Sequence, residues 1–220
     1  MIPEYSRRPI GRSSTDFIYG VVATILQIVS SAANRIVKER LVDAKWEENK
    51  ITNQLRQKVV EEKNLLNEER GGELALRVEG EVGTFHTTEG RIDIKVIYDW
   101  DEKNYFGIEC KRLSGKNKGL DKKYVTDGLM RFITGKYSQG HQWGMMVGYV
   151  IDGMCEKAIQ FVQERIDEHR ACLRIKKEFT RENRFNDYSN LHSSLHQQKI
   201  TTTIIMILHY FFEIPQASAS

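Results

Sequence analysis

Two long stretches of the sequence carry apolar residues at a helical spacing. In residues 15–43 the apolar positions recur every three or four residues, which is typical of one face of an amphipathic helix. Residues 45–69 are highly charged and are followed by Gly71 and Gly72, which commonly end a helix. The pattern therefore predicts two successive helices. The apolar positions of the first are Phe17, Ile18, Val21, Val22, Ile25, Leu26, Val29, Ala32, Ile36 and Val37.

The pattern changes to alternation after residue 73. Apolar side chains occupy every second position in residues 74–82, 91–98 and 105–113, as expected of strands with one buried face. Polar segments separate these stretches, and the second segment has the aspartate-rich composition of a hairpin connection. Three consecutive strands are therefore predicted.

The rest of the chain contains both patterns. Residues 121–137 and 156–173 have helical spacing, residues 144–151 are an apolar run of the length of a buried strand, and residues 201–214 are rich in β-branched and aromatic side chains. With 220 residues the chain is long enough for one domain with a sizeable core. The predicted fold is α/β, with a central mixed β-sheet flanked by helices.

Alternation also decides which polar side chains share a face of the predicted sheet. Asp93 lies on the polar face of the second strand, and Glu109 and Lys111 lie on that of the third. Glu109 and Lys111 are expected about 6.6 to 6.8 Å apart along one strand. If the two strands pair as an antiparallel hairpin, Asp93 lies beside Glu109. These three residues are the candidate catalytic residues.

This trio suits the hydrolysis of a phosphodiester bond. The reaction needs a strong nucleophile near neutral pH and neutralisation of the charge that develops on the phosphate, and a hard divalent cation supplies both. Mg²⁺ is usually held by one or two carboxylates, which would be Asp93 and Glu109. Lys111 would orient the nucleophile or stabilise charge. The expected cofactor is Mg²⁺, for which Mn²⁺ can substitute.

Asp93 followed by Glu109-Cys110-Lys111 resembles the D…(D/E)xK signature of the PD-(D/E)XK nuclease superfamily. The core of that family is a helix, three antiparallel strands, a helix and a fourth strand, and the elements predicted for residues 45–151 have this order. The proline of the family name is missing before Asp93, but that position is degenerate in the superfamily. The resemblance covers about half of the chain and implies a restriction-endonuclease-like fold.

The resemblance also implies a magnesium-dependent endonuclease that cleaves DNA or, less often, RNA. A phage-defence or repair effector that is gated by a partner is the expected context. Many members carry a further acidic residue on the first core helix, for which Glu48 and Glu62 are the candidates, with Glu48 taken as a metal ligand. The expected division is an N-terminal helical extension (1–44), a nuclease-like domain (45–214) and a disordered tail (215–220).

The tripeptide alone decides nothing, because it recurs along the chain. Other matches to (D/E)xK lie at Glu48-Lys50, Glu61-Lys63, Asp93-Lys95, Asp101-Lys103 and Asp121-Lys123. What distinguishes the match at residues 109–111 is its strand, together with the preceding strand that carries Asp93. The alternative is a solvated sheet face with ordinary charge pairs. The chain would then be an inactive nuclease-fold module acting in nucleic-acid binding or complex assembly.

A basic cluster follows the third strand. Beside a nuclease site it would contact phosphates without reading sequence, whereas elsewhere it would be a solvated loop. Arg131, on the following helix, either contacts nucleic acid or pairs with Asp127. The helical spacing slightly favours the pair with Asp127. The cluster comprises Arg112, Lys116, Lys118, Lys122 and Lys123.

Other candidate ligands are weaker. Glu79 and Glu81 on the first strand are alternatives for completing the metal site. His192 and His196 have the spacing that holds a metal on a helix, but no third ligand with matching spacing is visible. The three cysteines are widely separated, which favours neither a disulfide framework nor a zinc site and fits a reducing cytoplasm. The net charge of +3 permits nucleic-acid binding without requiring it.

The apolar stripe of residues 17–37 needs a partner. Polar residues such as Gln27 interrupt it, so a soluble amphipathic helix is expected rather than a membrane span. Its partner could be the second helix, the same helix of another subunit or a different protein. A homodimer is expected, because cleavage of both DNA strands usually needs two copies of a single-site enzyme. No reader of base edges is recognised, so a recognition or regulatory subunit is a further expected partner.

Overall fold

Seven strands form one mixed sheet at the centre of the protein. The computed structural model describes residues 15–83, 91–101, 103–185 and 188–216. β3, β4 and β7 run parallel to one another, whereas the other neighbouring strands pair antiparallel. The predicted α/β architecture with a central mixed sheet is confirmed. In spatial order the strands are β1 (Arg77–Gly83), β2 (Arg91–Ile97), β3 (Tyr105–Leu113), β4 (Trp143–Val150), β7 (Ile204–Glu213), β6 (Leu191–Gln197) and β5 (Ile175–Arg181).

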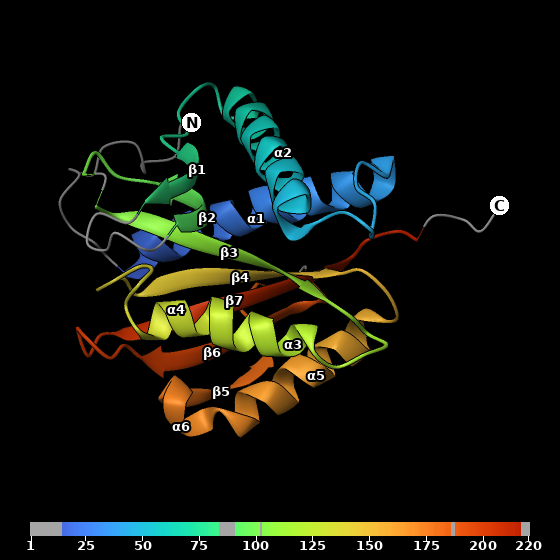
Figure 1. The fold of residues 1–220 in the computed structure, drawn as a ribbon. Helices are drawn as coiled ribbons and strands as arrows, with labels where there is room; N and C mark the ends of the chain where they lie inside the picture. The colour runs from blue at the N-terminus through green and yellow to red at the C-terminus, as the bar shows by residue number, and fades with distance from the viewer. Residues whose placement is uncertain (1–14, 84–90, 102, 186–187, 217–220) are drawn as a thin grey trace.

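Two long helices cover one face of the sheet (Figure 1). α1 (Thr15–Glu39) and α2 (Glu48–Glu69) pack against each other, and their apolar residues form one core with those of the central strands. α1, which lies in the segment expected to form an extension, therefore packs in the same core as α2 and the sheet. The buried apolar residues of α1 are Val22, Ile25, Leu26, Ile28, Val29, Ala32, Ala33 and Ile36.

The segment Ile18–Glu39 of α1 is also long and apolar enough to cross a membrane by length and composition. In the structure 50% of its most apolar window is buried inside the protein. Its apolar stripe contacts α2 and the sheet, as predicted for an amphipathic helix. The partner that this stripe requires is thus found within the same chain.

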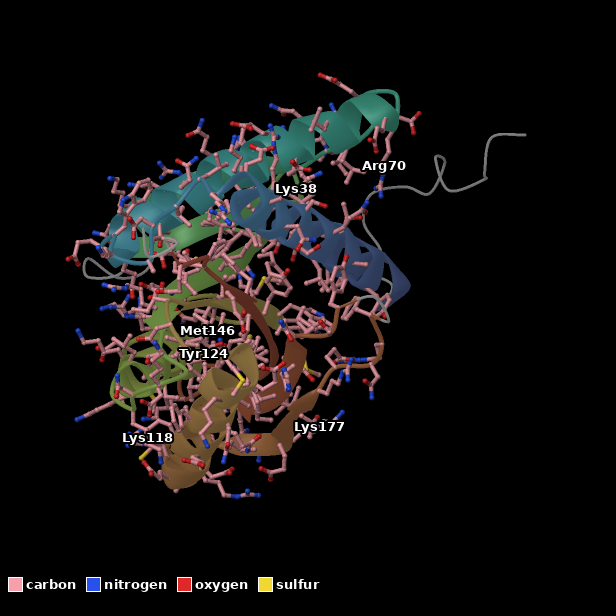
Figure 2. The ribbon with its side chains drawn as sticks, turned by 90° about the vertical axis from the view of Figure 1, so that its right-hand side faces the viewer. Lys38, Arg70, Lys118, Tyr124, Met146 and Lys177 are labelled. Carbon is pink, nitrogen blue, oxygen red and sulfur yellow. The ribbon has the colours of Figure 1, made fainter. Side chains whose placement is uncertain are left out.

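Shorter helices cover the opposite face, where a second apolar core lies. Figure 2 shows Tyr124 and Met146 in the interior of this half of the molecule, and both side chains are fully buried. The helix expected over residues 121–137 is present, but its middle is a π-helical turn and it ends at Ile133. The elements are α3 (Leu120–Lys123), the π-helical turn η2 (Tyr124–Leu129), α4 (Met130–Ile133), α5 (Cys155–Glu168) and α6 (Arg170–Leu173).

Strands β5 and β6 are not predicted by the sequence. β5 reads IKKEFTR and lies at an edge of the sheet, while β6 reads LHSSLHQ and buries polar side chains. Neither has the apolar alternation of a strand with one buried face. The spacing of His192 and His196 could hold a metal only on a helix, and both residues lie on strand β6, where positions four apart are about 13 Å apart.

A chain of hydrogen bonds satisfies the buried polar side chains of β6 and β7. His196 Nδ1 lies 2.8 Å from the Leu173 carbonyl oxygen, and Ser194 Oγ lies 2.7 Å from His196 Nε2 and 2.8 Å from His209 Nε2. The Tyr124 hydroxyl lies 3.0 Å from His209 Nδ1. The Leu173 carbonyl oxygen can only accept a hydrogen bond, and this fixes the direction of every other bond in the chain. His196 donates to Leu173, Ser194 donates to His196, His209 donates to Ser194, and Tyr124 donates to His209.

Both rings of this chain must be neutral for the pattern to hold. Burial lowers the pKa of His196 to about 4 and that of His209 well below its usual value. The network therefore holds Tyr124 of η2 against β7, and through it the helical segment that faces β3.

Replacing Ser194 by alanine should destabilise the protein by about 1 to 3 kcal/mol, because the two imidazole nitrogens that it bridges would remain buried without a partner. Urea denaturation followed by circular dichroism measures this loss. Ser189→Ala is the matched control, since Ser189 is exposed. An equal stability of the two variants would contradict the assigned network.

Candidate active site

The candidate residues meet where β2 separates from β3. β2 pairs with β3 from Ile97 opposite Tyr105 to Ile94 opposite Ile108. β3 continues beyond Ile108 as a partner of β4, through Leu113. Its other edge is therefore left without β2 over these last residues. We call this place the β2–β3 fork.

Side chains take over the hydrogen bonds that β2 leaves unmade. Asp93 Oδ2 accepts a hydrogen bond of 2.7 Å from the backbone N–H of Cys110, and Glu48 Oε2 accepts one of 3.1 Å from that of Arg112. Lys111 Nζ donates to the Cys110 carbonyl oxygen at 2.9 Å. The predicted catalytic residues Asp93 and Lys111 are thus brought to one edge of β3.

Lys111 joins the two remaining carboxylates. Its Nζ lies 2.8 Å from Glu109 Oε1 and 2.8 Å from Glu48 Oε1. Glu48 is the first residue of α2, so the N-terminal end of this helix faces the fork. Of the two acidic candidates on this helix, Glu48 lies at the site, whereas Glu62 pairs with Arg35 at 3.2 Å.

Arg131 also reaches the site. Its Nη1 lies 3.0 Å from Glu109 Oε1 and 2.5 Å from the hydroxyl of Tyr137. The expected pair with Asp127 is not formed, and Asp127 instead accepts a hydrogen bond from the hydroxyl of Thr126. Helical spacing misled here because η2 is a π-helical turn, which rotates the residues after it relative to an α-helix.

Tyr137 is a site residue that the sequence did not reveal. The chain turns back after α4 and places the backbone N–H of Tyr137 3.1 Å from the Arg131 carbonyl oxygen. The signal available in the sequence was Gly135, which adopts a φ of 76° in this turn. Such a turn can return an aromatic residue to the helix that precedes it.

Burial changes the acidity of the carboxyl groups. Glu109 has 0% exposure, and burial followed by the nearby Asp93 raises its pKa to about 8, although Lys111 and Arg131 act in the opposite direction. Burial also raises the pKa of Asp93. For Lys111 burial lowers the pKa, but the charges of Glu109 and Glu48 outweigh it and the pKa is raised. The site therefore combines a proton-retaining carboxyl with a firmly charged lysine.

The carboxylates at the fork are of the kind that Mg²⁺ prefers as ligands. Glu109 Oε2 is buried and has no hydrogen-bond partner among the described residues. Within the same ranges no group of three His, Cys, Asp or Glu residues has the spacing of a metal site. In the structure the ammonium group of Lys111 lies between the carboxylates of Glu48 and Glu109.

Of the weaker metal-ligand candidates on β1, Glu79 does not join this set. Glu79 pairs with Arg77 at 3.0 Å and lies 3.9 Å from Lys95. The side chain of Glu81 lies outside the described residues. Asp93, Glu109 and Glu48 therefore remain the candidate ligands.

The basic cluster divides into two groups. Arg112 is half-buried and donates to the Ala44 carbonyl oxygen, and Lys118 pairs with Glu164 at 2.5 Å. These two residues are engaged within the protein. The remaining members, Lys116, Lys122 and Lys123, are exposed and lie in the loop after β3 and in α3.

Glu109→Gln should become more stable relative to the unaltered protein as the pH rises from 5 to 8. A glutamate in the unfolded chain releases its proton near roughly pH 4.3, whereas Glu109 in the folded protein retains it to about pH 8. Between these pH values the folded state binds more protons than the unfolded state. The unaltered protein therefore loses stability as the pH rises through this range. Glutamine does not titrate, so the Glu109→Gln variant does not lose stability in this way. Its free energy of unfolding relative to the unaltered protein should rise by at least about 1.4 kcal/mol, the equivalent of one pKa unit.

Urea denaturation in EDTA at several pH values measures this gain. The control is Glu73→Gln, at an exposed position, which should show no such gain over this range. A stability difference between Glu109→Gln and the unaltered protein that stays constant with pH would show that burial does not perturb Glu109.

Comparisons with protein-family models, with curated proteins and with solved structures gave no significant match. A fold of this class supports unrelated activities, so architecture alone does not decide what the protein does. The assignment of function therefore depends on the residues at the β2–β3 fork.

Proposed function

We propose that this chain is a metal-dependent nuclease of the PD-(D/E)XK type that hydrolyses phosphodiester bonds of DNA. The observation that carries the proposal is the convergence of Asp93, Glu109, Lys111 and Glu48 at the β2–β3 fork, with Lys111 in contact with both glutamates. The proposed catalytic residues are Asp93, Glu109 and Lys111, with Glu48 as a further ligand.

The order of elements supports the restriction-endonuclease-like assignment. α2 is followed by the antiparallel strands β1, β2 and β3, then by the helical segment α3 to α4, and then by β4 beside β3. This is the order of the family core. By contrast, the matching tripeptide at Asp121 lies on α3, where Asp121 pairs with Arg165 at 2.9 Å. Position in the fold therefore distinguishes one match from another.

Each residue has a distinct role in the proposed reaction. Asp93 and Glu109 would hold Mg²⁺ or Mn²⁺, and Glu48 would complete the set after Lys111 moves from between the glutamates. When bound, the cation would supply Lewis acidity, activating water near neutral pH and neutralising charge on the phosphate. Lys111 carries a fixed positive charge and would orient the attacking water or stabilise the developing phosphate charge.

The position of α2 supports binding of a phosphate at the same place. Glu48 begins this helix, so the backbone N–H groups of its first turn lie close to the fork. Helix N-termini favour negative charge, and the phosphate of a nucleic acid would gain from this field. Lys116, Lys122 and Lys123 would extend the contact along the backbone.

A second function is favoured by the hydrogen bonds of the carboxylates. Asp93 and Glu48 each accept a backbone N–H, which is a structural task. A chain that uses them only in this way would be an inactive nuclease-fold module for nucleic-acid binding or complex assembly. A Mn²⁺ titration followed by thermal unfolding separates the two functions, since only the nuclease should be stabilised by the ion.

The wider context of the proposed nuclease stays a prediction. It comprises a homodimer, a recognition or regulatory subunit, a cytoplasmic location and a task in phage defence or repair. The buried residues of the α1 stripe pack within the chain.

The purified protein should cleave plasmid DNA in the presence of Mg²⁺ or Mn²⁺, and EDTA should stop the cleavage. Glu109→Gln and Lys111→Ala should each lower the cleavage rate at least about 100-fold, because the first removes a ligand of the cation and the second removes a charge that acts on the reacting phosphate. Agarose gel electrophoresis over time gives the rates, and circular dichroism confirms that both variants are folded.

The matched controls are Glu73→Gln and Lys177→Ala, at exposed positions away from the fork, which should cleave at the unaltered rate. Cleavage by Glu109→Gln and Lys111→Ala at that same rate would place the activity elsewhere. Cleavage of RNA but not of DNA under these conditions would correct the substrate.

Replacing Lys116, Lys122 and Lys123 together by alanine should reduce the salt dependence of DNA binding. Each phosphate contact contributes roughly 0.9 to the slope of log K against log salt, so the slope should fall by roughly two to three. Fluorescence anisotropy with a labelled duplex at several KCl concentrations measures it. Lys177→Ala should leave the slope unchanged, and an unchanged slope in the triple variant would remove this loop from the proposed interface.

A further inference from the structure

Glu109 is held by two cations on the same oxygen. Lys111 Nζ and Arg131 Nη1 lie 2.8 Å and 3.0 Å from Glu109 Oε1, while Oε2 of this carboxylate has no hydrogen-bond partner among the described residues. Lys111 belongs to the signature of the proposed nuclease, but Arg131 does not. Its presence on the central carboxylate therefore needs a separate explanation.

The geometry of the helical segment brings Arg131 to this position. The π-helical turn η2 ends at Leu129, two residues before Arg131, and π-helical turns occur frequently at functional sites. Gly128 within the turn allows a close approach to β3, because a Cβ there would lie 2.5 Å from Met146 Cε and 3.4 Å from Lys111 Cγ. The same turn thus packs against the Lys111 side chain and directs Arg131 toward Glu109.

Tyr137 gives Arg131 a second anchor. The Tyr137 hydroxyl lies 2.5 Å from Arg131 Nη1. The turn that carries Tyr137 is fixed by Gln198, whose amide donates to the carbonyl oxygens of Phe132 and Ser138 at 3.1 and 2.8 Å. A neutral phenol can hold a guanidinium whether or not it is paired with a carboxylate. Arg131, with 34% of its side chain exposed, can therefore leave Glu109 while it stays at the site.

Once Glu109 has released its proton, a divalent cation changes the sign of the net charge of the site. With all groups ionised, the carboxylates of Asp93, Glu109 and Glu48 exceed the cations Lys111 and Arg131 by one charge. A divalent cation makes the set positive by one, and a single phosphodiester group would neutralise it. The guanidinium group of Arg131, once the cation displaces it from Glu109, is thus available for the phosphate. Arginine binds phosphate groups in a planar, bidentate manner.

We propose that Arg131 is a switch between the resting and the substrate-bound site: it occupies Glu109 in the resting protein and, once a divalent cation binds, turns to contact the scissile phosphate. This inference rests on the proposed nuclease function and adds a regulation to it. Arg131 competes with the cation, so the site is completed only when cation and phosphate are both present. A nuclease that must not act without substrate gains a restraint in this way.

Arg131→Gln should bind Mn²⁺ about 5-fold or more tightly than the unaltered protein, because removing a competing charge removes an unfavourable coupling between Arg131 and the ion. The same variant should bind a labelled DNA duplex more weakly in Ca²⁺ and should cleave about 100-fold more slowly in Mg²⁺, because it lacks a phosphate contact. Isothermal titration with MnCl₂, fluorescence anisotropy and gel assays measure the three effects.

Arg181→Gln is the matched control, at an exposed position on the edge strand β5, and should change none of the three measurements. Thermal unfolding in EDTA shows whether Arg131→Gln is folded. Arg131→Lys keeps the charge and should bind Mn²⁺ about as tightly as the unaltered protein. This variant replaces Arg131→Gln in the test if the glutamine variant does not fold. Tighter Mn²⁺ binding by Arg131→Lys would contradict competition by charge.

The outcomes separate this inference from the proposed function. If the unaltered protein cleaves DNA and binds Mn²⁺ while Arg131→Gln binds Mn²⁺ no more tightly, the switch is overturned and the nuclease stands. If Mn²⁺ binding tightens but DNA binding and cleavage stay unchanged, Arg131 does not contact the phosphate and the switch is likewise overturned. If the unaltered protein neither binds Mn²⁺ nor cleaves, the proposed function fails, and the switch fails with it.

Discussion

The separation of β2 from β3 is the constraint on which the site depends. A strand edge inside a protein exposes backbone groups that cannot stay without hydrogen bonds, because each one left buried and unpaired costs free energy. At the fork the N–H groups of Cys110 and Arg112 obtain carboxylate acceptors from Asp93 and Glu48. The carbonyl oxygen of Cys110 obtains the ammonium group of Lys111. Satisfying the edge of β3 and assembling the charged groups are therefore one structural solution.

This solution concentrates charge where water is scarce. Glu109 is fully buried, and its pKa is raised because burial disfavours its ionised form. The two cations on its Oε1 compensate only in part, which leaves the carboxyl group able to gain from a further positive charge. Clusters of strongly perturbed ionisable groups are typical of functional sites, although structural ion pairs also perturb pKa values. The unpartnered Oε2 of Glu109 distinguishes this set from a closed structural network.

The sequence predicted the parts of the site that depend on strand alternation. Asp93, Glu109 and Lys111 were placed together by the period of two, and the register of β2 with β3 ends with Ile94 opposite Ile108, so Asp93 and Glu109 come directly after the last pair. Glu48 followed only from the resemblance, because sequence spacing does not show where a helix begins relative to a distant strand.

Features that depend on tertiary contacts were missed. Neither β5 nor β6 has an apolar alternation. In β6 the reason is that serine and histidine side chains are buried, and the network from Tyr124 to Leu173 supplies their hydrogen bonds. The position of Arg131 depends on a π-helical turn whose sequence, YVTDGL, has no pattern that separates it from an α-helix. Tyr137 reaches Arg131 through a turn held by Gln198, a residue 61 positions later in the chain.

The most direct test of the account is a crystal structure of the protein soaked in MnCl₂, with anomalous scattering used to locate the ion. The account predicts an anomalous peak in contact with the carboxylates of Asp93 and Glu109, with Lys111 displaced from between Glu109 and Glu48. Well-ordered carboxylates with no peak between them, and Lys111 still paired with both glutamates, would contradict a metal-dependent active site at the β2–β3 fork.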